Sequence, residues 1–188
     1  MKDKSSTSPR WRAEDLILLA VAVAVVAADQ VTKSLVVAHL PLGQSMDLTP
    51  WLSPAFQLTH ITNTGIVFGL LPGLGDLFVV IAVAVVAMLV LYYRHLPPGQ
   101  IPIRIALGLQ LGGALGNLVD RLARGSVVDF IDLNFWPLEK WAIFNLADAS
   151  IVSGAVLLGL VMLWESYRYN ASEEEQQRDG RATDPLHD

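Results

Sequence analysis

The sequence contains no cysteine and little charge, and both features narrow the class of protein. Without cysteine there can be no disulfide, no zinc ribbon, no Cys-ligated iron–sulfur cluster and no cysteine nucleophile. Charged residues make up 16% of the 188 residues, against about 25% in soluble domains, whereas apolar types reach 53%. The net charge is -5, and no run of lysine and arginine forms the basic stripe that nucleic-acid binding needs. An ordinary soluble domain and a nucleic-acid-binding protein are both disfavoured.

Two common hydrolase motifs are also missing. No GxSxG occurs, and Lys33 is one residue from Ser34, so their side chains point to different faces of a helix and serine hydrolysis is poorly supported. HExxH is absent as well. Metal-ligand spacing is not found among the histidines, which are His39, His60, His95 and His187. A metal site is therefore not expected.

The sequence does have four long apolar stretches. They run over residues 16–37, 77–93, 103–119 and 146–164, each close to the ~20 residues that cross about 30 Å of hydrocarbon. Runs such as VVIAVAVVAMLVL are apolar on every face, unlike the one-sided stripe of a soluble amphipathic helix. The chain is predicted to be an all-α polytopic membrane protein, with four transmembrane helices in a single domain over residues 1–170.

The first stretch also has features of a secretory signal peptide, because Lys2, Lys4, Arg10 and Arg12 precede it. Three more spans follow, and the helical pattern continues past Ala28, so an uncleaved first span is the simpler interpretation. Four basic residues precede the first span and none lies in the loop to the second. The positive-inside rule therefore predicts that both termini are cytoplasmic.

Three segments outside the spans have their own patterns. FQLTHIT alternates apolar and polar residues, which predicts a short strand and a small sheet in the outer loop over residues 39–76. Residues 120–145 carry Trp136 and Trp141, which are typical of the membrane interface, and we expect this segment to lie along the headgroups. Residues 171–188 have almost no apolar content, which predicts a disordered cytoplasmic tail.

Polar side chains within or beside the apolar spans gather at one predicted depth. A central charge costs about 2.5–3.5 kcal/mol on insertion scales, so each such residue needs a reason. Under the predicted topology they all fall near the outer face: Asp29 and Lys33, Asn63 and Gly65, Asn117, Asp120 and Arg121, Asp129, and Asn145 and Asp148. One polar site near the outer leaflet is predicted.

Each of these features also has a purely structural interpretation. Asp29 and Lys33 are one helical turn apart and can be an intrahelical ion pair, and Asp120 with Arg121 can be an interfacial charge pair. Asp148, three residues after Asn145, can cap the fourth helix. Close helix packing is the ordinary meaning of small residues four apart, a spacing seen among Gly108, Gly112, Gly113 and Gly116.

Two carboxylates in one partly dry site favour a particular chemistry. They repel each other, so one keeps its proton while the other stays ionised, which is how an aspartic peptidase acts on water and a peptide carbonyl. A water-activating aspartate pair is the best chemical interpretation. The alternative from another class is a small transporter in which the same carboxylates relay protons, or a non-catalytic four-helix membrane protein.

Five motifs carry a resemblance to a known family. DQVTK, NTGIVFG, GGALGNLVDR, VVDFIDL and FNLADAS, in this order, closely resemble the bacterial lipoprotein signal peptidases, the signal peptidase II family, over about residues 29–164. The resemblance implies four transmembrane helices, with a small β-sheet and a short interfacial helix at the outer face of the bacterial cytoplasmic (inner) membrane. It also implies an aspartic endopeptidase that cuts prolipoproteins before the diacylglyceryl-modified cysteine. No cofactor is implied, and globomycin is the expected inhibitor.

The resemblance also assigns residues. Asp129 of VVDF and Asp148 of NLAD correspond to the catalytic pair, and either can begin as the protonated partner. Asp132 is not chosen, because in an extended stretch it points away from the face of Asp129 and it does not match the motif. Where the family often has two small residues after NTG, this chain has Ile66 and Val67. The implied supporting residues are Asn63, Gly65, Asn117, Asp120, Arg121, Asn145, Ala147, Asp29 and Lys33.

Overall fold

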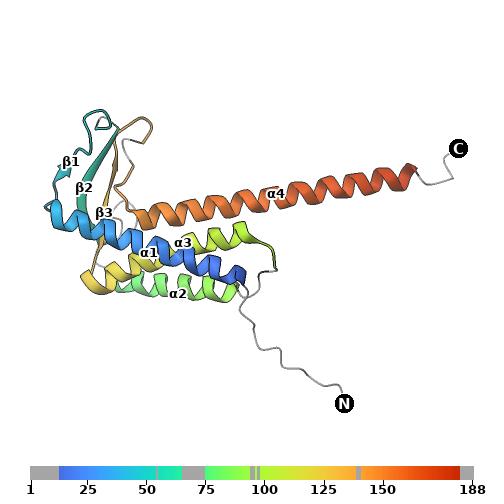
Figure 1. The fold of residues 1–188 in the computed structure, drawn as a ribbon, viewed down its shortest axis with the longest axis horizontal. Coiled ribbons are helices and arrows are strands. Elements are labelled where there is room, and N and C mark those ends of the chain that lie inside the picture. Colours follow the sequence, from blue (N-terminus) through green and yellow to red (C-terminus); the bar gives the residue numbers. More distant parts are fainter. Residues whose placement is uncertain are drawn as a thin grey trace, which may run out of the picture.

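The structure, a computed structural model, describes residues 13–53, 55–64, 75–93, 96, 98–138 and 141–182. Over these ranges the chain forms four helices and three strands. The helices are α1 (Ala13–His39), α2 (Gly75–Tyr93), α3 (Ile101–Arg124) and α4 (Leu146–Ala182), and the strands are β1 (Ser45–Met46), β2 (Phe56–Asn63) and β3 (Val127–Leu133). Figure 1 shows the helices gathered in a bundle with the sheet at one end, which we call the sheet end.

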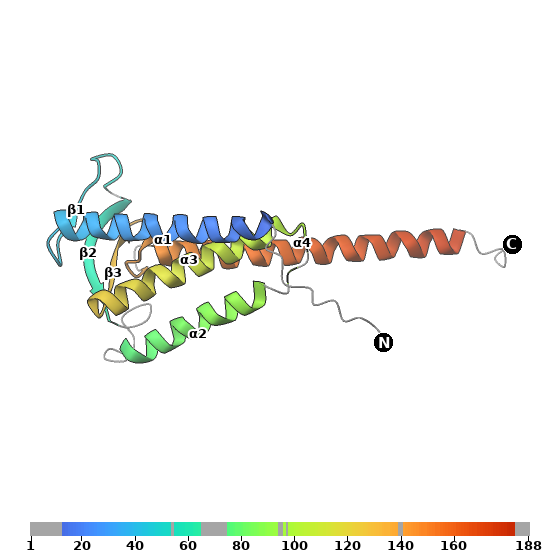
Figure 2. The same ribbon diagram turned by 60° about the horizontal axis from the view of Figure 1, so that its bottom comes forward.

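Helix α3 is the central helix, because it packs against each of α1, α2 and α4. Figure 2 shows α2 on the outside of α3, apart from α1 and α4. The glycine spacing has its expected meaning: a Cβ added to Gly112 would lie 2.8 Å from the carbonyl oxygen of Ala22 on α1. One added to Gly113 would meet the carbonyl oxygen of Ala147 on α4. Small residues on α3 therefore let three helix backbones approach closely.

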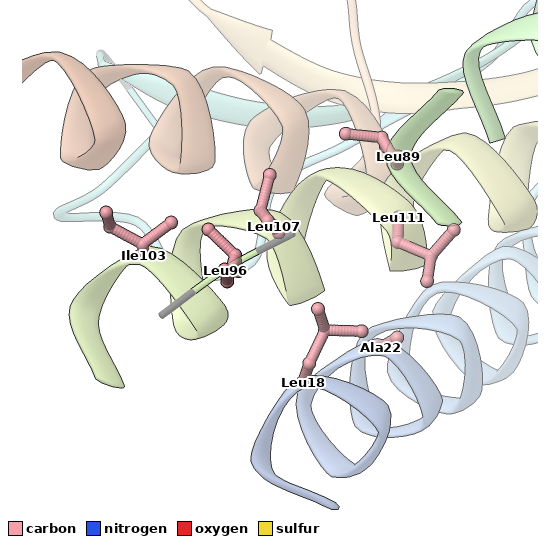
Figure 3. Packing of buried hydrophobic residues seen from close by; sticks show 7 residues of the cluster. All are labelled: Leu18, Ala22, Leu89, Leu96, Ile103, Leu107 and Leu111. Carbon is pink, nitrogen blue, oxygen red and sulfur yellow. The ribbon is translucent and has the colours of Figure 1, made fainter. Parts of the chain in front are cut away.

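An apolar core fills the half of the bundle away from the sheet end. It joins α1, α2, α3 and the segment before α3 (Figure 3), through the buried side chains of Leu18, Ala22, Leu89, Leu96, Ile103, Leu107 and Leu111. Burial of such side chains contributes roughly 1.5–3 kcal/mol each. Apolar packing therefore contributes most of the contacts in this half, whereas most of the buried polar residues lie in the other half.

The outward faces of the helices are apolar as well. Large side chains such as Leu16 on α1, Val80 on α2 and Leu160 on α4 are exposed. Among the described helices, two are long and apolar enough to cross a membrane, over Glu14–His39 and Leu146–Glu174, and α2 has a shorter apolar stretch, Val79–Leu91. Length and composition by themselves thus support two of the four predicted crossings. The apolar stretch described in α2 is shorter, and the central helix α3 carries charged residues near both of its ends.

The small sheet predicted for the outer loop is confirmed. Strand β2 covers FQLTHIT and pairs antiparallel with β1 and β3, in the order β1-β2-β3. Val128 and Phe130 of β3 pack with Val36 and Leu40 at the end of α1. Because side chains alternate along a strand, Asp129 points to the other face of β3.

Two expectations differ from the structure. The implied short interfacial helix is not found among the described residues, where residues 134–138 form turns and residues 139–140 lie outside the description. Main-chain pairing accounts for this, because Asn134 N–H donates to the Ala55 carbonyl and Ile131 pairs with Phe144. Residues 171–182 continue helix α4 instead of forming a disordered tail, since NASEEEQQRDGRA is rich in helix formers.

The opposite end of the bundle holds a second buried charge. Arg104 of α3 is 1% exposed and pairs with Glu14 at 3.4 Å and with Asp15 at 3.5 Å, both in the first turn of α1. The Glu14 carboxylate also accepts a hydrogen bond from the Gly99 N–H. Arg104 therefore joins α1 to the start of α3.

Candidate active site

The polar residues predicted to share one depth do meet at the sheet end. Asp29 and Lys33 come from α1, Asn117 and Asp120 from the last turns of α3, Asp129 from β3, and Asn145 and Asp148 from the start of α4. Gly125, with φ +74°, ends α3 and lets the chain turn into β3 two residues later. Four segments far apart in sequence thus bring their polar groups together, as the single-site prediction required.

Asp129 is held by two amide groups. Its side chain is 1% exposed and accepts hydrogen bonds from Asn63 Nδ2 at 3.0 Å and from Asn145 Nδ2 at 2.6 Å. Burial, and then the charge of Asp148, raises the pKa of Asp129 to about 6 from 3.8, although both amides and Lys33 act in the opposite direction. A carboxyl group with this pKa exchanges its proton close to neutral pH, as general acid–base chemistry needs.

Asp148 is both a capping residue and a site residue. Its Oδ1 accepts from Asn117 Nδ2 at 2.7 Å and its Oδ2 from the Asn145 N–H at 3.3 Å. The Asp148 N–H in turn donates to Asn145 Oδ1 at 2.9 Å, which completes a reciprocal cap at the start of α4. The capping interpretation is therefore correct, and it fixes the carboxylate in place without removing it from the site.

Lys33 lies at the centre of a buried charge cluster. It is 0% exposed, and its Nζ lies 2.9 Å from Asp29 Oδ2 and 3.0 Å from Asp120 Oδ2. Arg124 adds a longer pair with Asp120, at 3.6 Å. The interpretation of Asp29 and Lys33 as an isolated intrahelical pair is wrong, because the cluster joins α1 to α3.

Both carboxylates of this cluster also accept from the main chain. Asp29 Oδ1 accepts from the Ala147 N–H at 3.0 Å, and Asp120 Oδ2 accepts from the Val128 N–H at 3.1 Å. Sequence reasoning missed Gln30, whose amide donates to Asp29, to Asp120 and to the Gly116 carbonyl. Its signal was its place beside Asp29 in DQVTK.

A cavity of about 760 Å³ opens at the two aspartates. Its polar lining includes Asp129, Asp148, Asn63, Asn117 and Arg121, together with Ser153. Its apolar lining comes mainly from α2, α4 and the segment before α4, and includes Ile81, Val85, Trp141, Phe144 and Val152. Two carboxylates in a cavity lined mostly by apolar side chains are suited to acid–base chemistry on an apolar substrate.

Other predicted residues are placed differently. Arg121 lines the cavity and its Nη1 donates to the Asn117 carbonyl at 3.4 Å, while Ala147 is fully buried. Asp132 is not among the lining residues and accepts a hydrogen bond from Thr59 Oγ1. Gly65, Ile66 and Val67 lie outside the described residues. Over the described ranges, no three His, Cys, Asp or Glu side chains gather in a way that suits a metal ion.

A family model described as signal peptidase (SPase) II matches residues 21–164. The chain belongs to the signal peptidase II family. Among similar signal peptidase II proteins, the lipoprotein signal peptidase of Halothermothrix orenii is 41% identical over 145 residues, which are 77% of this chain and 93% of that relative. The lipoprotein signal peptidase of Bacillus subtilis is 42% identical over 146 residues, which are 78% of this chain and 92% of that relative.

A solved structure described as a bacterial membrane enzyme, obtained by the in meso method at 2.3 Å resolution, shares the fold seen here. It superposes with a TM-score of 0.73 at 32% identity, over 79% of this chain and 88% of that one. A second, at 1.9 Å resolution, has a TM-score of 0.70 at 33% identity, over 78% of this chain and 92% of that one. The chain is therefore a peptidase and a membrane enzyme, and the resemblance of its five motifs is confirmed.

Proposed function

We propose that this signal peptidase II removes the signal peptide of prolipoproteins by cutting before the diacylglyceryl-modified cysteine, with Asp129 and Asp148 as the catalytic pair. The observation that carries the proposal is the cavity that both carboxylates line, each held by an asparagine amide. Relatives named lipoprotein signal peptidase support the substrate class.

The two carboxylates divide the chemistry between them. The ionised one takes a proton from water, which attacks the scissile carbonyl, and the protonated one donates to the carbonyl oxygen. The tetrahedral intermediate collapses when the leaving nitrogen is protonated. The raised pKa of Asp129, to which the charge of Asp148 contributes, supports one proton held by the pair near pH 6.

The cavity also suits the apolar parts of such a substrate. Apolar side chains of α2 and α4, such as Ile81, Val85 and Val152, line the cavity together with the polar groups. A diacylglyceryl chain and an apolar signal helix held there would place the scissile bond at the aspartates, so that much of the entropic cost of alignment is met on binding. Asn63, Asn117 and Arg121 are the groups available to hold the peptide backbone or the polar head of the lipid.

We propose that the four helices each cross the bacterial inner membrane, with both termini in the cytoplasm and the sheet end in the outer leaflet. Exposed aromatic residues support two interfaces: Trp136 and Trp141 at the sheet end, and Trp164 and Tyr167 further along α4. The 19 residues from Leu146 to Trp164 span about 27 Å at a rise of ~1.5 Å per residue, close to the hydrocarbon thickness. The exposed apolar faces of α1, α2 and α4 are then in contact with lipid.

The test uses purified protein in detergent with a diacylglyceryl-modified prolipoprotein and the same precursor without lipid. Wild type should cut only the lipidated form, and Asp129→Asn and Asp148→Asn should each reduce kcat by at least about 10³-fold. Asp132→Asn is the matched control, because its carboxylate lies on the same strand yet does not line the cavity. It should keep activity close to that of wild type.

Three outcomes would overturn parts of this proposal. Cleavage at the wild-type rate by a well-folded Asp129→Asn or Asp148→Asn variant would contradict the assignment of these two residues as the catalytic pair. Complete loss of cleavage activity in the Asp132→Asn variant would indicate that the wrong carboxylate of β3 has been assigned to the catalytic pair. If the folded wild-type protein does not cut the lipidated precursor, the proposed substrate is wrong. A lack of inhibition by globomycin would also contradict the proposed substrate.

A further inference from the structure

Lys33 has a role in the site that catalysis by the two aspartates does not explain. It is fully buried and is not among the residues that line the cavity, so it does not contact a substrate there. Its ammonium group nevertheless has three partners on two helices, namely Asp29, Asp120 and Asn117. A buried ammonium group is costly unless it is paired, and these three partners compensate for that cost. The role of Lys33 is therefore sought in the other contacts that the three partners make.

Each of the three partners leads to a residue at or beside a catalytic aspartate. Asp29 accepts from the N–H of Ala147, the residue before Asp148. Asp120 accepts from the N–H of Val128, the residue before Asp129. The Lys33 ammonium group therefore holds both Asp29 and Asp120. These two carboxylates in turn bind the main chain of α4 and of β3 next to Asp148 and Asp129.

The third partner leads to a catalytic carboxylate directly. Lys33 Nζ donates to Asn117 Oδ1 at 3.0 Å, and Asn117 Nδ2 donates to Asp148 Oδ1 at 2.7 Å. Asn145 Nδ2 donates to the same Asn117 oxygen at 3.1 Å and to Asp129 Oδ1 at 2.6 Å. The two amides thus connect Lys33 to both aspartates.

The direction of these hydrogen bonds follows from the chemistry of Lys33. An ammonium group can only donate, so the group of Asn117 that faces it must be the oxygen, and the NH₂ group must face Asp148. A flipped Asn117 would place its NH₂ group against the ammonium and the Asn145 amide, and its oxygen against the Asp148 carboxylate. Both contacts would be repulsive, so Lys33 selects the orientation in which Asn117 donates to Asp148.

We infer that Lys33 is a positioning residue that fixes the positions of the two catalytic carboxylates. It orients the Asn117 amide, and it holds Asp29 and Asp120 against the main chain beside each catalytic aspartate. The inference rests on the proposed function of Asp129 and Asp148. Lys33 acts through other residues, and above all through Asn117.

The test is a double-mutant cycle on cleavage of the diacylglyceryl-modified precursor. Lys33→Met and Asn117→Ala should each lower kcat by about 10²-fold, a loss of the size seen when one oriented donor is removed. The double variant should lose little more than Asn117→Ala alone, because residues that act as a unit are not additive. KM should change little in Lys33→Met, since Lys33 does not line the cavity, and Lys33→Arg, which also only donates, should recover kcat.

Arg104→Met is the matched control, because it removes the buried cation at the opposite end, which also pairs with two carboxylates. It should lower thermal stability and leave kcat close to that of wild type. If Lys33→Met does not fold, Asp29→Asn combined with it restores the charge balance of the cluster and is measured in its place.

The inference is overturned if the losses of Lys33→Met and Asn117→Ala multiply to about 10⁴-fold, if Lys33→Met keeps kcat, or if Arg104→Met loses kcat to the same extent. These results leave the proposed function intact as long as wild type cuts and Asp129→Asn does not. Failure of wild type to cut the lipidated precursor would instead overturn the proposed function, and the inference with it.

Discussion

At the scale of single residues, the site is a set of buried polar groups whose directions are fixed by their partners. Asn145 is the most connected of them, since it donates to Asp129 and to Asn117 and caps α4 through its oxygen. Residue types and motif order were enough to name most of these groups from the sequence. Their bonding was not, because partners such as Lys33 and Asn117 are 84 residues apart in the chain.

The stability of the folded state should depend on the protonation of Asp129. Its folded pKa of about 6 lies above 3.8, so between about pH 4 and pH 6 the folded state binds this proton more tightly than the unfolded state. Stability from this group is therefore full below about pH 4 and is lost as the pH rises through 6, by up to about 3 kcal/mol. Asp129→Asn cannot ionise, so its melting temperature relative to wild type should rise from about pH 4 to about pH 7.5. Thermal unfolding in detergent measures this, and a difference that stays constant or falls with pH would contradict it.

At the scale of elements, close packing of α3 against α1 and α4 decides where the site lies. The predicted helices agree with the observed ones to within a few residues, apart from α4, which is much longer than its apolar stretch. Apolar runs define the lengths of helices buried in a bundle or in lipid. They do not define where a helix of charged residues ends, and the tail of α4 was mispredicted for that reason.

Gly116→Ala should damage the site through α3. An added Cβ at Gly116 would lie 2.6 Å from Asp29 Oδ2, the oxygen that pairs with Lys33, and 3.4 Å from the Ala147 Cβ. We expect a loss of about 1–3 kcal/mol of unfolding free energy together with most of the activity. Gly159→Ala on α4, where nothing lies within 4 Å, is the control and should be neutral or stabilising. Equal behaviour of the two variants, measured by thermal unfolding and cleavage, would rule out the close approach.

Removal of the end of α4 should leave catalysis intact. The helix continues beyond the bundle in Figure 1, and its described side chains after Asn170 are exposed. Truncation after Asn170 should therefore give kcat and KM close to those of the full chain with the lipidated precursor. A large loss in either constant would show that this part of the helix contributes to the site or to insertion.

At the scale of the whole molecule, the polar site and the apolar core occupy opposite halves of one bundle. The sheet closes the polar half, and Arg104 with its two acidic partners closes the other. Exposed apolar side chains cover the helices between these two ends. Exposed apolar side chains between two polar ends are typical of a protein surrounded by lipid, which agrees with membership of a family of membrane enzymes.

The proposed orientation can be tested with reporter fusions. A reporter fused after Tyr93, at the end of α2, should report the cytoplasm, and one inserted near Gln44, before β1, should report the outer side. The reason is the contrast between the basic N-terminal segment and the first loop, which has no lysine or arginine. The reverse pattern in fluorescence and phosphatase fusions would overturn the proposed topology.

The sequence by itself determined the class of protein, the four apolar segments, the family and the two aspartates, because hydropathy and ordered motifs are local properties of a chain. Only the tertiary structure decided what those residues do for one another. It placed α3 at the centre, opened a cavity between α2 and α4, and gave Lys33 partners from two helices. The physical reason is that hydrogen bonds and ion pairs between distant segments depend on how the helices pack, and no local pattern encodes which buried donor meets which acceptor.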